Sequence, residues 1–123
     1  MIYFDDLVAK LTGMQFQIYD ENWNLRNWVV DATATLLQDL NYSQSLLIKV
    51  EATVPSDFPD FETIQHDSSY LRIGYRPSGA QYLQDPFLET DMAFLKAIGV
   101  TLTAGEPVTL FISAPAFAFS YYG

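Results

Sequence analysis

Alternation of apolar and polar positions runs through most of this chain and predicts β-strands. Residues 14–20 alternate with a period of two, and residues 45–54 do so over a longer stretch. Turn-forming residues at 20–24 separate the first run from a similar run at 25–31, which predicts a hairpin. Further strands are expected at residues 70–76, 100–103, 108–113 and 116–122.

One segment, residues 85–98, breaks the alternation and has the pattern of a helix. Asp85 is a good N-cap residue, Pro86 fits the first helical position, and Gly99 ends the run. Between these ends the apolar residues recur every third or fourth position, which gives one stripe for a helix to bury. The sequence therefore predicts one helix packed on the strands.

Two other segments have weaker patterns. Residues 5–13 start with Asp and end with Lys and Gly, which predicts a short N-terminal helix that stops at Gly13. Residues 32–40 are ambiguous because Thr33 and Thr35 favour a strand, whereas the leucines fit one helical face. Strands joined by short turns favour antiparallel order. We predict a mainly β fold, an antiparallel β-sandwich or small barrel of about seven or eight strands, with an α+β fold as the alternative.

Composition is that of one globular domain spanning residues 1–123. Half of the residues are apolar and 15% are aromatic, enough to fill one core at this length. The chain has no cysteine, which excludes disulfides and thiolate metal sites. The N-terminal residues lack a signal-peptide pattern and no apolar run approaches the ~20 residues of a membrane helix. We expect synthesis in the cytoplasm and no membrane partner.

The charge balance disfavours nucleic acid as a partner. Fifteen acidic residues against six basic ones give a net charge of −9. Binding to a phosphate backbone needs a face rich in Lys and Arg, which this chain does not have. The carboxylates are scattered along the chain, and this pattern favours solubility over imitation of DNA.

Few residues are available for catalysis or for holding a cofactor. His66 is the single histidine and stands beside Asp67, but no Gly-x-Ser-x-Gly element supplies a nucleophile. Asp57, Asp60 and Glu62 bring three carboxylates together in one loop, but their spacing matches no calcium-binding loop. The sequence predicts a protein that is not an enzyme and needs no cofactor.

Aromatic residues in turns are the first candidates for binding. Phe58 and Phe61 lie in an acidic loop with two prolines, residues 55–67, and Trp23 lies in the first hairpin turn. Exposed aromatic side chains on loops often anchor protein interfaces, whereas the alternative is that both phenylalanines fold back over the sheet edge as a lid. If they are anchors, replacing both with serine weakens assembly and leaves the melting temperature unchanged.

The strand expected at residues 70–76 carries two of the three arginines. Arg72 and Arg76 are expected on its outward face, and Tyr75 on its inward face. The arginines are candidates for docking an acidic partner or a phosphate. The alternative is a pair of ordinary cross-strand ion pairs with the many carboxylates of this chain.

The end of the chain is the strongest candidate for self-association. Residues 108–123 carry no charge, in contrast to the acidic remainder. In the strand expected at 116–122, aromatic side chains alternate with small ones. The aromatic face holds Phe117, Phe119 and Tyr121, and the small face holds Ala116, Ala118 and Ser120. An uncharged strand without a blocking residue invites pairing with another chain, so we expect a homo-oligomer.

Residues 16–55 carry a further pattern: Ile18-Tyr19-Asp20, then Asn24-Leu25 after a turn, and finally Val54-Pro55 at the end of an alternating strand. This pattern resembles the opening of bacteriophage tail and baseplate hub proteins. It covers about a third of the chain, and residues 41–44 replace the glycine that these proteins usually have before the closing strand. We carry no functional residue across from this family.

The resemblance implies a structural protein of a phage particle, in the tail, the baseplate or as a capsid cement. Such a protein is made in the host cytoplasm, ends in the virion and contacts itself and other particle proteins. Two alternatives remain open. One is a soluble acidic inhibitor or adaptor that grips a host protein through residues 55–67; the other is a carbohydrate-binding module that uses Trp23 and nearby tyrosines.

Overall fold

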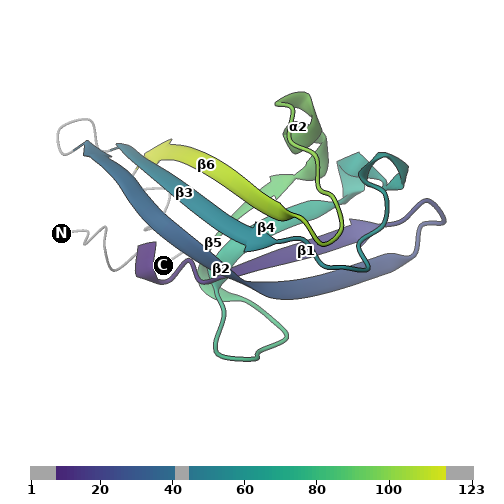
Figure 1. Ribbon diagram of the computed structural model, residues 1–123, viewed down its shortest axis with the longest axis horizontal. Coiled ribbons are helices and arrows are strands. Elements are labelled where there is room, and N and C mark those ends of the chain that lie inside the picture. Colours follow the sequence, from purple (N-terminus) through teal and green to yellow (C-terminus); the bar gives the residue numbers. More distant parts are fainter. Residues whose placement is uncertain (1–7, 41–44, 116–123) are drawn as a thin grey trace.

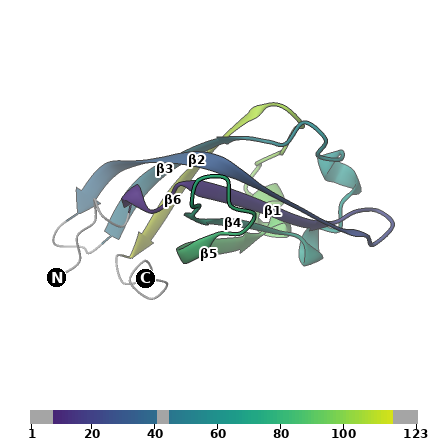
Figure 2. The ribbon, with the colours of Figure 1, turned by 90° about the horizontal axis from the view of Figure 1, so that it is seen from below.

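The computed structural model describes residues 8–40 and 45–115, which form a sheet of six antiparallel strands curled into half a barrel (Figures 1 and 2). The strand order is β5-β4-β1-β2-β3-β6, so β5 and β6 are the edges. The mainly β, antiparallel fold predicted from the sequence is confirmed. The strands are β1 (Gly13–Tyr19), β2 (Leu25–Leu40), β3 (Ser45–Thr53), β4 (Tyr70–Tyr75), β5 (Gln84–Asp91) and β6 (Pro107–Pro115). One α-helix, α2 (Met92–Ala97), and two 3-10 turns, η1 (Phe61–Thr63) and η2 (His66–Ser68), complete the described elements.

The long strand β2 connects the two halves of the sheet. Its first part pairs with β1 and, from Ala32 onward, it pairs with β3. An irregularity between Leu36 and Gln38 interrupts the second pairing, and such bulges increase the twist of a strand. Figure 2 shows the consequence, since β2 and β3 lie on one side of the half-barrel and β4 and β5 on the other. The ambiguous residues 32–40 are therefore a strand.

One hydrophobic core fills the inside of the curl. The alternation predicted for residues 14–20 is confirmed, because Met14, Phe16 and Ile18 of β1 have no exposed surface. Ile48 and Val50 of β3 are equally buried and approach from the other half of the sheet. Each such side chain contributes roughly 1.5–3 kcal/mol when it leaves water. The inward positions of the two halves thus fix the curl of the sheet.

The helix predicted over residues 85–98 is wrong for its first half. Residues 84–91 are strand β5, and only Met92–Ala97 are helical. The backbone of β5 pairs with β4, with a register shift between Gly74 and Tyr75 opposite the segment that contains Pro86. An edge strand accepts proline at such an irregularity, because no second neighbour needs its missing N–H. Long-range pairing thus overrides the local signal of a helix start.

The short helix α2 begins at a different aspartate from the one predicted. The Asp91 side chain accepts a hydrogen bond of 2.7 Å from the Phe94 backbone N–H, which makes Asp91 the N-cap. Gly99 adopts a φ of 89° just after the helix, so the predicted stop at Gly99 is confirmed. Met92 and Leu95 face the core, and Phe94 and Ile98 do not.

Three smaller expectations also change. Residues 100–103 are not a strand, and the turn after them is held by Val54, the residue that follows β3: Gly105 N–H donates to the carbonyl of Val54. Tyr75 is 38% exposed and does not point inward, since the β4–β5 register shifts at this residue. The described part of the chain holds six strands, fewer than expected, and the strand expected at 116–122 lies outside it.

The predicted N-terminal helix lies partly outside the described residues, and Gly13 is the first residue of β1 rather than a helix stop. A Cβ atom at Gly13 would come within 2.6 Å of both Arg76 Cβ and Leu83 Cδ2. Glycine is needed here because another segment crosses β1 closely.

Candidate functional site

The two loop phenylalanines are core residues. Phe58 is 5% exposed and Phe61 is 2% exposed. The Phe58 ring packs 5.6 Å from Phe16 and 5.3 Å from Trp28, measured between ring centroids. Phe61 packs edge-on against His66 at 4.8 Å. Neither phenylalanine is exposed, which favours the interpretation that they fold back on the sheet, although Phe58 packs on the central strands β1 and β2 and not on a sheet edge.

Polar contacts hold the same loop on the sheet. Arg26 lies over the Trp28 ring at 4.7 Å and donates to the Asp57 carbonyl, and Trp28 Nε1 donates to Asp57 Oδ1 at 2.9 Å. Glu62 forms an ion pair with Lys96 at 2.9 Å. The carboxylates of Asp57 and Glu62 therefore bind different partners and do not converge on one point. No group of three His, Cys, Asp or Glu residues suited to a metal ion occurs among residues 8–40 and 45–115.

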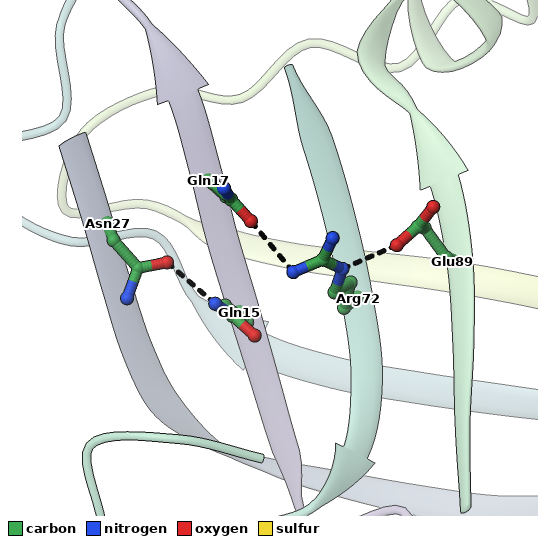
Figure 3. Close-up of polar contacts among 5 residues, drawn as sticks. All are labelled: Gln15, Gln17, Asn27, Arg72 and Glu89. Atoms are coloured by element: carbon green, nitrogen blue, oxygen red, sulfur yellow. Dashed lines mark hydrogen bonds and ion pairs between the residues drawn. The ribbon is translucent and has the colours of Figure 1, made fainter. Parts of the chain in front are cut away.

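The two candidate arginines are engaged in polar contacts. Arg72 donates to Glu89 on β5 and, at 2.7 Å, to Gln17 on β1. Figure 3 shows these side chains in a row across the sheet, extended by the contact from Gln15 to Asn27 on β2. The row therefore joins four strands on the face opposite the core. Cross-strand polar pairs of this kind stabilise a sheet.

Arg76, just after β4, pairs with Asp31 at 3.0 Å and donates through Nε to the carbonyl of Ala80. Its backbone N–H donates to Thr12 Oγ1. These contacts hold the turn at residues 77–80 on the outer face. Arg72 and Arg76 thus stand as cross-strand and turn-fixing residues, the second of the two interpretations from the sequence.

Trp23, by contrast with the loop phenylalanines, is exposed. It has 60% of its surface exposed, a φ of 62°, and a ring 6.1 Å from that of Tyr19. Asp20 fixes this turn, because its carboxylate accepts hydrogen bonds from the backbone N–H groups of Asn22 and Asn24. A hydrogen-bonded turn therefore presents one indole ring at the tip of the hairpin.

Sequence reasoning did not predict an apolar feature of the described residues, a half-open cavity of about 600 Å³ between the two edges of the sheet. Strands β4, β5 and β6, helix α2 and the residues that follow the helix line this cavity. Its apolar walls include Leu71, Ile73, Leu88, Leu95, Leu110 and Ile112. No local signal reveals it, because its walls come from segments about forty positions apart that only the curl of the sheet brings together.

Large apolar side chains remain exposed around this cavity. Phe94 is 56% exposed, Ile98 is 57% exposed and Phe111 on β6 is 65% exposed. Scattered apolar residues are normal on a surface, but a group beside an apolar cavity is a candidate contact site. The strands that border the cavity, β5 and β6, are also the two edges of the sheet. We call the cavity with these two edges the β5–β6 seam.

The candidate residues at the end of the chain, Ala116 to Tyr121, lie outside the described residues. They follow β6 directly. Within the described residues, no helix is long and apolar enough to cross a membrane. Comparisons with protein-family profiles, with curated proteins and with solved structures find no significant match to this chain.

Proposed function

We propose that this protein is a non-enzymatic structural or assembly protein that acts through protein–protein contacts. The observation that carries the proposal is the β5–β6 seam, an apolar cavity with exposed Phe94, Ile98 and Phe111 around it. Protein interfaces are centred on apolar and aromatic side chains that are exposed in the free subunit. The resemblance of residues 16–55 to phage tail and baseplate hub proteins supports a phage particle as the place of assembly.

The edges of the sheet add to this argument. An unpaired strand edge offers a row of N–H and C=O groups to another chain, and natural monomers block such edges with Lys, bulges or covering segments. β6 contains no charged residue, and β5 offers only acidic ones. Between its terminal prolines, Pro107 and Pro115, β6 therefore has no charged side chain that opposes a neighbouring strand, whereas β5 is less suited to pairing because of its proline and its irregular register.

Electrostatics predicts how the assembly responds to salt. Each copy has a net charge of −9, so copies repel each other at long range. Salt screens this repulsion, with a Debye length of about 10 Å at 0.1 M. Self-association through the apolar seam should therefore strengthen as salt rises, opposite to the behaviour of a contact built on ion pairs.

Native mass spectrometry with light scattering at micromolar concentration tests the proposal. We expect a symmetric multimer whose dissociation constant decreases as the salt concentration is raised from 0.05 M to 0.5 M. A monomer at every concentration and salt, which also fails to bind any purified component of the particle, would contradict an assembly role.

Exposed Trp23 keeps carbohydrate binding as a second candidate. The ring lies beside Tyr19 on a hydrogen-bonded turn, and indole rings stack on sugar faces. Binding to a glycan array that Trp23→Ala abolishes would support this function. The adaptor alternative rests on the acidic loop, which lacks exposed aromatic anchors because Phe58 and Phe61 are buried.

A further inference from the structure

We infer that the β5–β6 seam of one copy receives the C-terminal segment, residues 116–123, of a second copy. The inference rests on the proposed assembly function and names the partner of its site. The receiving surface is described above: an apolar cavity of about 600 Å³ between two strand edges. An open apolar hollow of this size, with exposed apolar side chains around it, is typical of surfaces that bind a ligand or another chain.

The chemistry of the cavity selects an uncharged, apolar chain. Among the described residues, the only charged one that lines it is Glu89, whose carboxylate already accepts a hydrogen bond from Arg72. A charged peptide would bury a charge without a partner, which costs free energy. Residues 116–123 read AFAFSYYG and carry no charge. Within this acidic protein, the segment that matches the cavity best is thus the end of the chain itself.

The pattern of this segment fits a strand that enters between two edges. In an extended chain, Phe117, Phe119 and Tyr121 share one face, and the small side chains of Ala118 and Ser120 share the other. The aromatic face can fill the cavity, while the small face allows close approach. The backbone N–H and C=O groups can pair with the free edge of β6 or of β5.

A second copy is favoured over a return of the same chain. Pro115 still pairs with Ser45 at the end of β6, so a return has to turn within residues 116–123. Tight two-residue hairpin turns need positive φ angles and therefore Gly, Asn or Asp, and this segment has only Gly123. A four-residue loop directly after Pro115 would place Phe117 and Phe119 in the turn, so they could no longer fill the cavity. A segment from another copy needs no turn at all.

The contact area is sufficient for a stable complex. Each buried aromatic side chain covers roughly 150–250 Å². Three of them bury on the order of 600 Å² of the segment and a similar area of the seam. The total of about 1,200 Å² reaches the lower limit of specific protein interfaces. A reciprocal exchange between two copies doubles this value.

The test mixes two full-length variants that are each defective in one half of the contact. Phe117→Ser with Phe119→Ser removes the aromatic face of the donated segment and keeps the seam intact. Phe94→Glu with Ile98→Glu places charges beside the cavity and keeps the segment intact; both residues are more than half exposed, so the fold should tolerate the change. Leu25→Glu, 54% exposed on the β1–β2 hairpin, is the matched control.

We expect the wild type and the control to be multimers and each defective variant alone to be a monomer. The loss of a central aromatic anchor weakens such a contact roughly thirtyfold or more. A mixture of the two defective variants should form a complex with one copy of each, because one supplies the seam and the other the segment. Native mass spectrometry reads this stoichiometry directly.

Other outcomes overturn the inference and identify the actual occupant. If the wild type is a monomer and the Phe117→Ser/Phe119→Ser variant melts at a lower temperature, the C-terminal segment covers the seam of the same chain. A monomer that binds an apolar dye in the cavity, and loses it with Ile98→Glu, indicates a small apolar ligand. A wild-type multimer that both variants leave intact places the interface elsewhere and leaves the assembly function standing. If the serine variant does not fold, Ala118→Lys replaces it as the donor-defective variant.

Discussion

The segment between β3 and β4 and the β5–β6 seam both place aromatic side chains over apolar walls, but only the first is closed. Phe58 and Phe61 are almost fully buried, whereas Phe94 and Phe111 have more than half of their surface exposed. The difference shows that aromatic residues in a loop can belong to the core, while those on regular elements can be free for contact.

Backbone partners explain why the first segment closes. The N–H of Phe58 donates to the Pro55 carbonyl, and the N–H of Gln65 donates to Tyr19 on β1. The hydroxyl of Ser69 donates to the Gln65 carbonyl and accepts from the backbone N–H of Tyr19. These bonds satisfy buried polar groups and hold the loop against the sheet. At the seam, by contrast, the described residues provide no strand between β5 and β6.

The largest effect should come from opening the closed segment. Phe61→Ser, or Phe58→Ser, should lower the free energy of unfolding by about 3–5 kcal/mol, because each removes a buried aromatic ring and leaves a cavity. Urea unfolding followed by circular dichroism measures the loss. Trp23→Ser is the control and should cost less than about 0.5 kcal/mol, since Trp23 is exposed. If Phe61→Ser lowers the free energy of unfolding by less than about 1 kcal/mol, Phe61 is not a core residue and the loop is again a candidate for binding a partner.

A second prediction concerns the crossing of the 76–83 turn over β1. Gly13→Ala should cost about 1–3 kcal/mol, because the new methyl group meets Arg76 and Leu83 at 2.6 Å. Gly79→Ala is a useful comparison, since its Cβ meets no atom within 4 Å and only its φ of 71° is unfavourable. Thermal unfolding should rank Gly13→Ala as the more destabilising. The reverse ranking would mean that the turn packs loosely, like the seam.

The helix beside the seam depends on its cap. Asp91→Ala removes the acceptor for the Phe94 N–H and should lower the free energy of unfolding by about 1 kcal/mol. Asp91→Asn keeps an acceptor at this position and should retain most of the stability. Because α2 carries Phe94 and ends directly before Ile98, the alanine variant should also weaken self-association. Equal stability of the alanine and asparagine variants would show that packing alone holds α2.

The open seam should tolerate substitutions that the closed segment does not. Ile98→Ser should change the free energy of unfolding by less than about 0.5 kcal/mol, because Ile98 is 57% exposed. The same change should weaken self-association, measured by sedimentation. A large loss of stability with unchanged association would make Ile98 a core residue and remove the contrast between the two regions.

The smallest effect should follow from metal removal. Asp57, Asp60 and Glu62 are engaged with Arg26 and Trp28, with the backbone of η1, and with Lys96 respectively. A chelator should therefore leave the melting temperature unchanged in differential scanning fluorimetry. A drop of several degrees that calcium restores would show that the closed segment is held by an ion as well.

The local pattern of the sequence predicted the strands well. Strands β1, β3 and β4 lie within a residue or two of the predicted runs, because alternation follows directly from the backbone geometry of a half-buried strand; β2 starts where predicted but continues through the ambiguous residues to Leu40. The turn at Gly79 and the stop at Gly99 were also predictable, since both have the positive φ that glycine allows.

Contacts between distant segments could not be predicted in the same way. Residues 84–91 have helix-start residues, but pairing with β4 makes them a strand; Phe58 and Phe61 have loop neighbours, but packing on Phe16 and Trp28 buries them. The sequence by itself therefore determined a β-rich, acidic chain with an uncharged end. The tertiary structure decided which aromatic residues are buried and where the seam lies, because burial depends on which strands meet across the curled sheet, and local periodicity carries no information about that pairing.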